Sequence, residues 1–189
     1  MRIRPRALAV STALALAACT GYGAVTATSS AQPAFGTRED VSYATKLWQA
    51  LSEAKLVGPQ TLRSYPYEGT PPHGDVLEFL TTDLTIDNHT GIVLVKKNYY
   101  GDGIDDEDVL EDPAKYMQSI TVMFKREAGY DPEDLDWFWV KYNPDGSLAS
   151  NPKGMKLAGR VAKGASQGCI ACHKSAEGDD MVYTPIRLE

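Results

Sequence analysis

The apolar positions of the chain first follow a helical period and then change to short strand-like runs. From residue 39 to residue 57 apolar side chains recur every three or four positions, which predicts one amphipathic helix. Thr37 or Asp40 can cap the start of this helix, and Gly58-Pro59 ends it.

Beyond this helix, runs of β-branched and aromatic residues are bounded by Gly, Pro, Asn and Asp, which is typical of strands. They cover residues 76–80, 92–97, 120–125 and 137–142. Asn143-Pro144-Asp145-Gly146 predicts a turn between two antiparallel strands, and residues 113–118 predict a brief helix. The pattern indicates one α+β domain, a mostly antiparallel β-sheet with an N-terminal helix and a short C-terminal helix.

Residues 1–18 have the pattern of an export signal. Arg2, Arg4 and Arg6 precede a small-apolar run over residues 7–18, which is too short to span a bilayer as a helix. The run ends in Leu16-Ala17-Ala18-Cys19, which resembles a bacterial lipobox and makes Cys19 the predicted lipidated residue. Ordinary cleavage between residues 18 and 34 is the alternative. Either route predicts export to the periplasm. If Cys19 is lipidated, the N-terminal lipid anchor is the only membrane contact that we expect.

Composition sets further limits on the class of protein. Residues 19–37 are rich in Ala, Ser, Thr and Gly without a hydrophobic period, so we expect a flexible tether before a folded domain at residues 38–189. The chain has 19 basic and 25 acidic residues, a net charge of −6, and its body carries no basic stripe. This balance argues against nucleic acid as a partner.

Seven acidic residues crowd the segment 102–112. Oxygen ligands at alternate positions suit calcium, but this segment has no glycine midway and no Glu at the distance of a bidentate ligand. A solvated acidic loop is therefore the favoured interpretation.

Three cysteines exclude a disulfide scaffold, and two of them lie in Cys169-Ile170-Ala171-Cys172-His173. This C-x-x-C-H sequence is the attachment signal for a c-type haem. Two thiols three positions apart share one side of a helical turn and can form thioethers with both haem vinyl groups, while the next imidazole ligates the iron. The sequence thus predicts one covalent haem c per chain on the short C-terminal helix. Cys169 and Cys172 hold the haem, and His173 is the iron ligand.

Two other uses of this motif fit the chain less well. A thioredoxin-like dithiol follows a strand in a βαβ unit, and the sequence shows no such unit before the motif. A structural zinc site would need a further ligand from His73 or His89, about a hundred residues upstream. Export favours haem, because bacterial c-type haem is attached outside the cytoplasm.

The sixth iron position has two alternatives. A vacant position gives a ligand-binding or catalytic haem, whereas a Met or His ligand gives an electron-transfer cytochrome. The candidate ligands are Met117, Met123, Met155, Met181, His73 and His89. A vacant position is favoured, because Met in such runs is mostly core filler and a histidine between proline and glycine is mostly a turn residue.

The body resembles the cytochrome P-460 family, which includes the c-prime-beta cytochromes, over residues 47–184. The matching segments are Pro72-His73-Gly74, the strand 91–96, Asp136-Trp137-Phe138-Trp139, and the end from Cys169 to Thr184. The resemblance implies a mostly antiparallel β-fold, a homodimer, His173 on the proximal side and a distal pocket without a protein ligand. It also implies that His73 and Met181 are structural.

Within this family, one branch has a lysine joined covalently to the haem edge and oxidises hydroxylamine to NO or N2O. The c-prime-beta branch lacks that bond and binds NO and CO. Counted from Gly91, Lys96 occupies the position of the family lysine and is the predicted cross-linking residue. Lys97 competes for this role from the other face of the strand, because side chains alternate. A third alternative is that both lysines end the strand in solvent.

The predicted function is an exported mono-haem protein that binds or oxidises small nitrogen compounds, hydroxylamine and NO, and exchanges electrons with a partner cytochrome. The alternatives are a c-prime-beta-like NO- or CO-binding protein and a six-coordinate electron carrier. The residues that would act as acid or base are not predicted.

Overall fold

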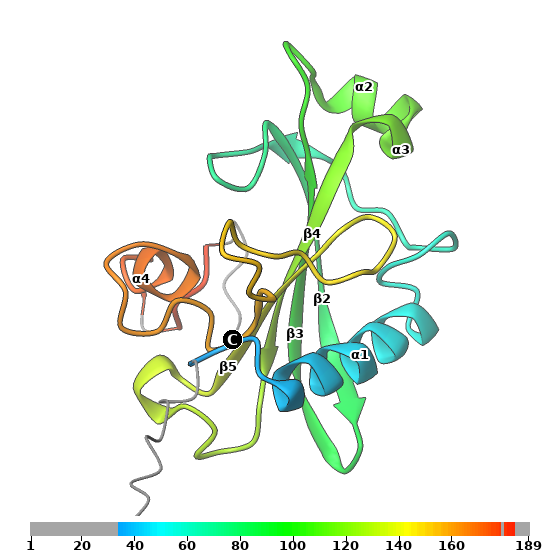
Figure 1. The fold of residues 1–189 in the computed structure, drawn as a ribbon. Helices are drawn as coiled ribbons and strands as arrows, with labels where there is room; N and C mark the ends of the chain where they lie inside the picture. The colour runs from blue at the N-terminus through cyan, green and yellow to red at the C-terminus, as the bar shows by residue number, and fades with distance from the viewer. Residues whose placement is uncertain (1–33, 179, 184–189) are drawn as a thin grey trace, which may run out of the picture. The chain divides into compact units, whose positions relative to one another are not determined.

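The structure is a computed structural model that describes residues 34–178 and 180–183 (Figure 1). The predicted signal peptide at residues 1–18, the lipidated Cys19 and the predicted tether up to residue 33 lie outside the described residues. Within the described part of the chain, no helix is both long enough and apolar enough to cross a membrane.

Six antiparallel strands form one sheet in which each strand pairs with the next one along the chain. They are β1 (Tyr67–Glu68), β2 (Val76–Ile86), β3 (His89–Tyr99), β4 (Met117–Lys125), β5 (Trp137–Tyr142) and β6 (Ala158–Gly159). With a few helices beside it, this meander confirms the predicted α+β fold class.

The strands β2 and β3 are longer than the runs 76–80 and 92–97 that predicted them. A two-residue turn, Asp87-Asn88, joins them as a hairpin, so that Ile86 pairs with His89. Asp87 has φ 53°, the left-handed backbone that two-residue hairpin turns commonly need. This turn lets the ladder continue through polar positions that interrupt the apolar run.

The helices are α1 (Arg38–Glu53), α2 (Asp106–Glu111), α3 (Pro113–Tyr116) and α4 (Cys169–His173), with a 3-10 turn η1 (Pro132–Asp134). Thr37 caps α1, and Asp40 completes a reciprocal capping box with it. The helix ends four residues before the predicted residue 57, because Lys55 turns the chain at φ 58°. Leu56 and Val57 are still buried, which explains why the apolar period continues past the helix.

The segment 102–112 is not a loop throughout, so the prediction of a solvated acidic loop is wrong for its second half. Asp105 caps α2 and exchanges hydrogen bonds with Asp108 in a capping box. Acidic side chains in the first turn also favour a helix, because they interact well with its positive N-terminal end. Across residues 34–178 and 180–183, no group of three His, Cys, Asp or Glu side chains could hold a metal ion.

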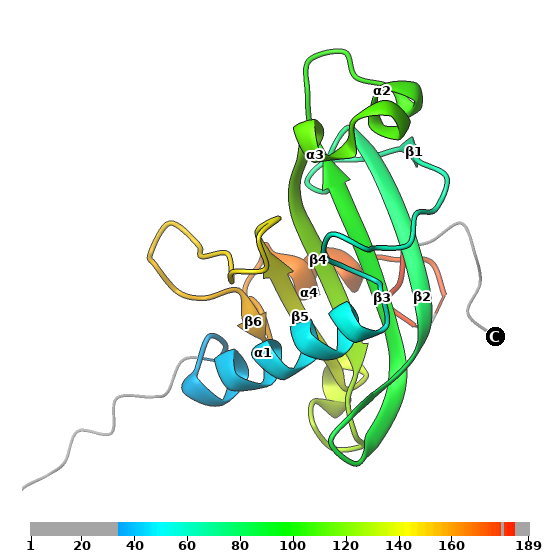
Figure 2. The same cartoon turned by 90° about the vertical axis from the view of Figure 1, so that its right-hand side faces the viewer.

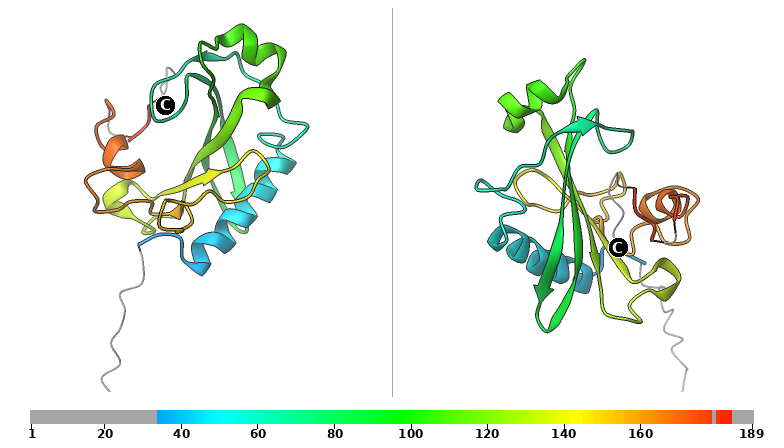
Figure 3. Two further views of the ribbon diagram at one scale, coloured as in Figure 1. Left: turned by 45° about the horizontal axis from the view of Figure 1, so that its top comes forward. Right: turned by 180° about the vertical axis from the view of Figure 1, so that it is seen from behind.

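The two faces of the sheet carry different layers. Ala44, Leu47 and Leu51 of α1 pack on one face in a fully buried cluster with residues of β3, β4 and β5. The other face, which includes Leu94 and Trp139, packs with α4 and the C-terminal segment. Figures 2 and 3 show α1 and α4 on opposite sides of the strands. The face turned toward α4 carries the candidate site.

Candidate haem site

The short helix α4 packs closely at its start, is buried at Ile170, and is held by an ion pair just past its end. Gly168, just before the helix, has φ 121°, and a Cβ there would lie 2.4 Å from the Cβ of Ala162, so this position requires glycine. Ile170 is buried in the cluster on this face of the sheet. Just past the helix, Lys174 Nζ lies 2.7 Å from Oδ1 of the buried Asp134. These contacts therefore fix the position of the C-x-x-C-H residues relative to the rest of the fold.

His173 is buried and held in one orientation. Its Nδ1 lies 2.8 Å from the carbonyl oxygen of Met181, so Nδ1 donates this hydrogen bond and Nε2 keeps its lone pair. The rings of Trp139 and Tyr183 meet the imidazole edge-on, at centroid distances of 4.8 and 5.3 Å. Burial lowers the pKa of His173, against the opposing effect of the Met181 carbonyl. A neutral imidazole whose other nitrogen donates to a carbonyl is the usual form of a metal-ligating histidine.

Both thiols of the motif and His173 line one cavity between α4 and the sheet, with a volume of about 420 Å³. Most of its walls are apolar; they include Phe79, Leu94, Met123, Trp139, Leu157 and Val161. A neighbouring cavity of about 490 Å³ shares His73, Lys96, Cys172 and His173 with the first.

These residues fit a c-type haem. Cys169 is half-buried and Cys172 exposed, and neither forms a disulfide. Burial raises the pKa of the Cys169 thiol, which favours its neutral form. Two free thiols, an imidazole with a free Nε2 and a largely apolar cavity are the groups that would hold a porphyrin and its iron.

The two lysines that competed in the sequence lie on opposite sides of β3. Lys96 lines the cavity, where its Nζ donates to the carbonyl oxygen of Tyr183 at 2.6 Å. Burial lowers its pKa, which favours the neutral amine that a cross-link would need. The covalent bond of Lys96 to haem stays a prediction.

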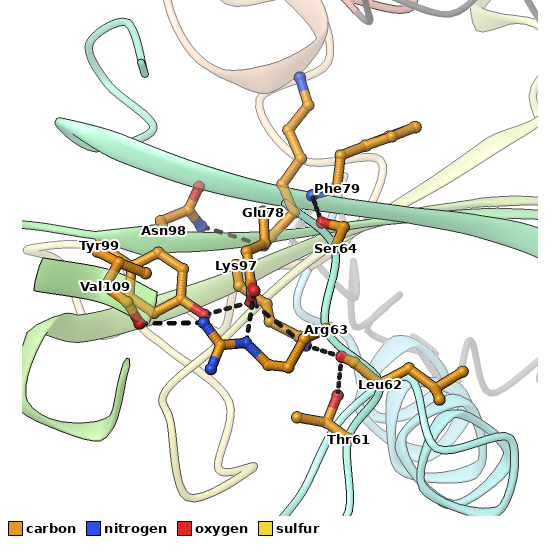
Figure 4. Close-up of polar contacts among 11 residues, drawn as sticks. Thr61, Leu62, Arg63, Ser64, Glu78, Phe79, Lys97, Asn98, Tyr99 and Val109 are labelled. Carbon is orange, nitrogen blue, oxygen red and sulfur yellow. Dashed lines mark hydrogen bonds and ion pairs between the residues drawn. The ribbon is translucent and has the colours of Figure 1, made fainter. Parts of the chain in front are cut away.

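Lys97 is fully buried in a polar network on the opposite face (Figure 4). Its Nζ donates to the carbonyl oxygen of Leu62 at 2.5 Å and lies 3.6 Å from Glu78 Oε2. The same carboxylate accepts hydrogen bonds from Arg63 and from Tyr99. The structure therefore places Lys97 away from the candidate haem site.

Among the six candidates for a sixth iron ligand, Met123 and His73 line the cavity. Met123 is 8% exposed and packs among apolar side chains of the sheet. Met181 contributes its carbonyl oxygen to His173, and His89 Nε2 lies 2.9 Å from the carbonyl oxygen of Lys125 instead. Met117 and Met155 are outside the lining of this cavity.

The position of His73 goes beyond the structural role that the resemblance implied. Its Nδ1 lies 3.3 Å from Thr121 Oγ1 of β4, and its ring centroid is 6.0 Å from that of His173. Burial lowers its pKa to about 4, and the nearby charges of Lys96 and His173 add to this effect. His73 is therefore a neutral imidazole in the wall of the cavity.

Thr121 and Lys141 are cavity residues that the sequence did not single out. In the ladder Lys96 pairs with Thr121, and Thr121 pairs with Lys141, so the three form a row across β3, β4 and β5. In the sequence, Thr121 and Lys141 each stand between apolar residues, which is typical of a strand. Only the pairing register of the strands shows that the two residues lie side by side.

Residues 83–184 match the family described as Cytochrome P460, which is more than half of the chain. No curated protein matches the chain, and neither does any solved structure. The matched segment contains Lys96 and the whole C-x-x-C-H motif, and the family implies a haem-binding cytochrome. The chain belongs to the cytochrome P460 family.

Proposed function

We propose that this protein is an exported c-type cytochrome that binds small nitrogen compounds at an open iron position and oxidises hydroxylamine. Cys169 and Cys172 would carry the two thioethers, and Nε2 of His173 would be the proximal ligand. When bound, haem supplies a redox-active iron with one position for a small ligand.

The observation that carries this proposal is the cavity beside His173. Its walls are largely apolar, and Met123 is packed into one of them. With a haem in this cavity, the apolar side chains around it would limit the entry of water to the iron, which strengthens polar interactions with a small ligand there. The proximal imidazole is held by the Met181 carbonyl, as a ligand on a fixed iron requires.

Oxidising hydroxylamine requires an acceptor for electrons and protons. One molecule of hydroxylamine gives NO with the loss of three electrons and three protons. Two molecules give N2O and water with the loss of four of each. A partner cytochrome would take up the electrons, and the exposed Cys172 and Tyr183 mark the side of the cavity that it can approach.

Optical and electron paramagnetic resonance spectra of the untreated haem-loaded protein test the open position. We expect a high-spin five-coordinate ferric iron and a hydroxylamine-dependent reduction of an added cytochrome. Acid extraction should leave the haem on the chain, while Cys172→Ala should retain at most one thioether. A low-spin spectrum overturns the open position, and haem released by acid overturns the covalent attachment.

Two observations favour alternatives that the same spectra separate. Two imidazoles bound to opposite sides of one metal have centres about 6 Å apart, from metal–nitrogen distances of about 2 Å. The 6.0 Å between His73 and His173 therefore favours a six-coordinate electron carrier, which His73→Ala would convert to high spin. In addition, none of the described residues that line the cavity is Asp or Glu. This lack of a carboxylate favours NO or CO binding without turnover.

We also propose that the protein is a homodimer, as the resemblance implies. Light scattering of the purified protein after size-exclusion chromatography should give twice the mass of the mature chain. A monomer mass would contradict it.

A further inference from the structure

Lys141 of β5 brings a positive charge to the haem cavity and has no partner there. It lines both this cavity and an open groove of about 720 Å³ beside it. Within residues 34–178 and 180–183, its Nζ makes no hydrogen bond or ion pair. Its positive charge interacts electrostatically with His73 and with Cys169, which line two other walls of the cavity. Lys141 therefore brings a positive charge to the boundary between the groove and the space that would hold the haem.

The neighbouring lysines are already engaged. Lys96 donates to the carbonyl oxygen of Tyr183, and Lys156, in the groove, donates to the carbonyl oxygen of Leu148 at 3.1 Å. No described Asp or Glu lines the cavity or the groove, although the whole chain has a net charge of −6. A partly buried cation beside apolar walls is costly unless an anion joins it.

Haem supplies such an anion, because it carries two propionate carboxylates at the edge opposite its vinyl groups. The cysteines would hold the vinyl edge at α4, which leaves the propionate edge free to reach another wall. We propose that Lys141 binds a haem propionate, with the groove toward Lys156 as the place where this edge of the haem meets solvent. The proposal rests on the haem site of the proposed function and adds the residue that recognises the carboxylates. An ammonium–carboxylate pair of this kind is a charge-assisted hydrogen bond.

Two readouts of the haem-loaded protein test the proposal without an activity assay. In Lys141→Met, the propionate bending band of the resonance Raman spectrum should shift. The reduction potential should also fall, because a nearby cation stabilises the added electron. Lys141→Arg keeps the charge and should stay close to wild type in both measurements. Should Lys141→Met load too little haem, Lys141→Gln carries the same test.

Lys156→Met is the matched control, because it removes the same charge from the groove but does not line the cavity. A shift in Lys141→Met that is absent in Lys156→Met supports the proposal. Equal changes in both variants would indicate that only the overall electrostatic field has changed. An unchanged spectrum of Lys141→Met would show that Lys141 does not contact a propionate. Either result overturns the proposal. A low-spin wild-type spectrum would overturn the proposed function instead, since the propionate band does not depend on the sixth position.

Discussion

Replacing Glu78 by Gln should strongly destabilise the fold while leaving the haem site unchanged. Glu78 has no exposed surface, and its carboxylate is the acceptor that Arg63, Lys97 and Tyr99 share in the network of Figure 4. The substitution keeps the size of the side chain and removes the negative charge. Lys97 then stays fully buried without its anion.

Two estimates give the expected loss in the free energy of unfolding. Removing one partner of a buried ion pair costs about 3–5 kcal/mol. Lys97 can also escape by losing its proton, which for a lysine with a pKa of about 10.4 costs about 4.6 kcal/mol at pH 7. We therefore expect a loss of about 3–5 kcal/mol in the free energy of unfolding. For a domain of this size that corresponds to a fall in Tm of about 6–20 °C.

The loss of stability should become smaller as the pH rises. Burial lowers the pKa of Lys97, and Glu78 opposes this effect, so its removal lowers the pKa further. The folded variant then binds fewer protons than the unfolded chain between the two pKa values of Lys97. Its stability rises with pH there, by at most about 1.4 kcal/mol per unit. The deficit relative to wild type should therefore narrow between about pH 7 and pH 10.

Urea unfolding of haem-loaded wild type and Glu78→Gln at pH 7 and at pH 9.5 measures both effects. Lys46→Met is the control, because it removes a lysine from an exposed ion pair, that with Asp87, and should stay within about 1 kcal/mol of wild type. A Glu78→Gln deficit below about 1 kcal/mol, or one that does not narrow with pH, would refute the reasoning.

Three further predictions concern haem attachment and export. Gly168→Ala should displace α4, because the new Cβ would meet Ala162 at 2.4 Å, and should lower the fraction of chains that carry haem in intact-protein mass spectra. Mass spectrometry of proteolytic peptides should find haem linked to the Lys96 peptide as well as to the C-x-x-C-H peptide; a free Lys96 peptide would contradict the cross-link and weaken the case for hydroxylamine oxidation. Cys19→Ser should move the protein from the membrane fraction to the periplasmic fraction, and an unchanged distribution would indicate ordinary signal cleavage.

The sequence predicted best those features that depend on neighbouring residues. The run 137–142 became β5 with the same bounds, and Thr37 caps α1 as predicted. Apolar alternation and a capping side chain act over a few positions, so they can be read directly. The haem motif is equally local, because its three functional residues lie within one short helix.

Features that depend on pairing across the sheet were missed. Thr121 was not singled out from the sequence, yet it lies between Lys96 and Lys141 in the ladder and contacts His73. The helix α2 was missed for another reason. Its acidic composition resembles that of a solvated loop, although its capping pair, Asp105 and Asp108, is local in the sequence.

The turn between β2 and β3 determines which of the two lysines faces the candidate haem site. Strand alternation separates Lys96 from Lys97 but does not say which of them faces the site. Once Asp87-Asn88 is a two-residue turn, the hairpin register places Glu78 opposite Lys97 and Phe79 opposite Lys96. A lysine opposite a glutamate can be buried on the face that α1 covers, because the pair compensates its charge. The lysine opposite Phe79 has no such partner across the strand, so it is the one that the fold leaves beside an apolar cavity.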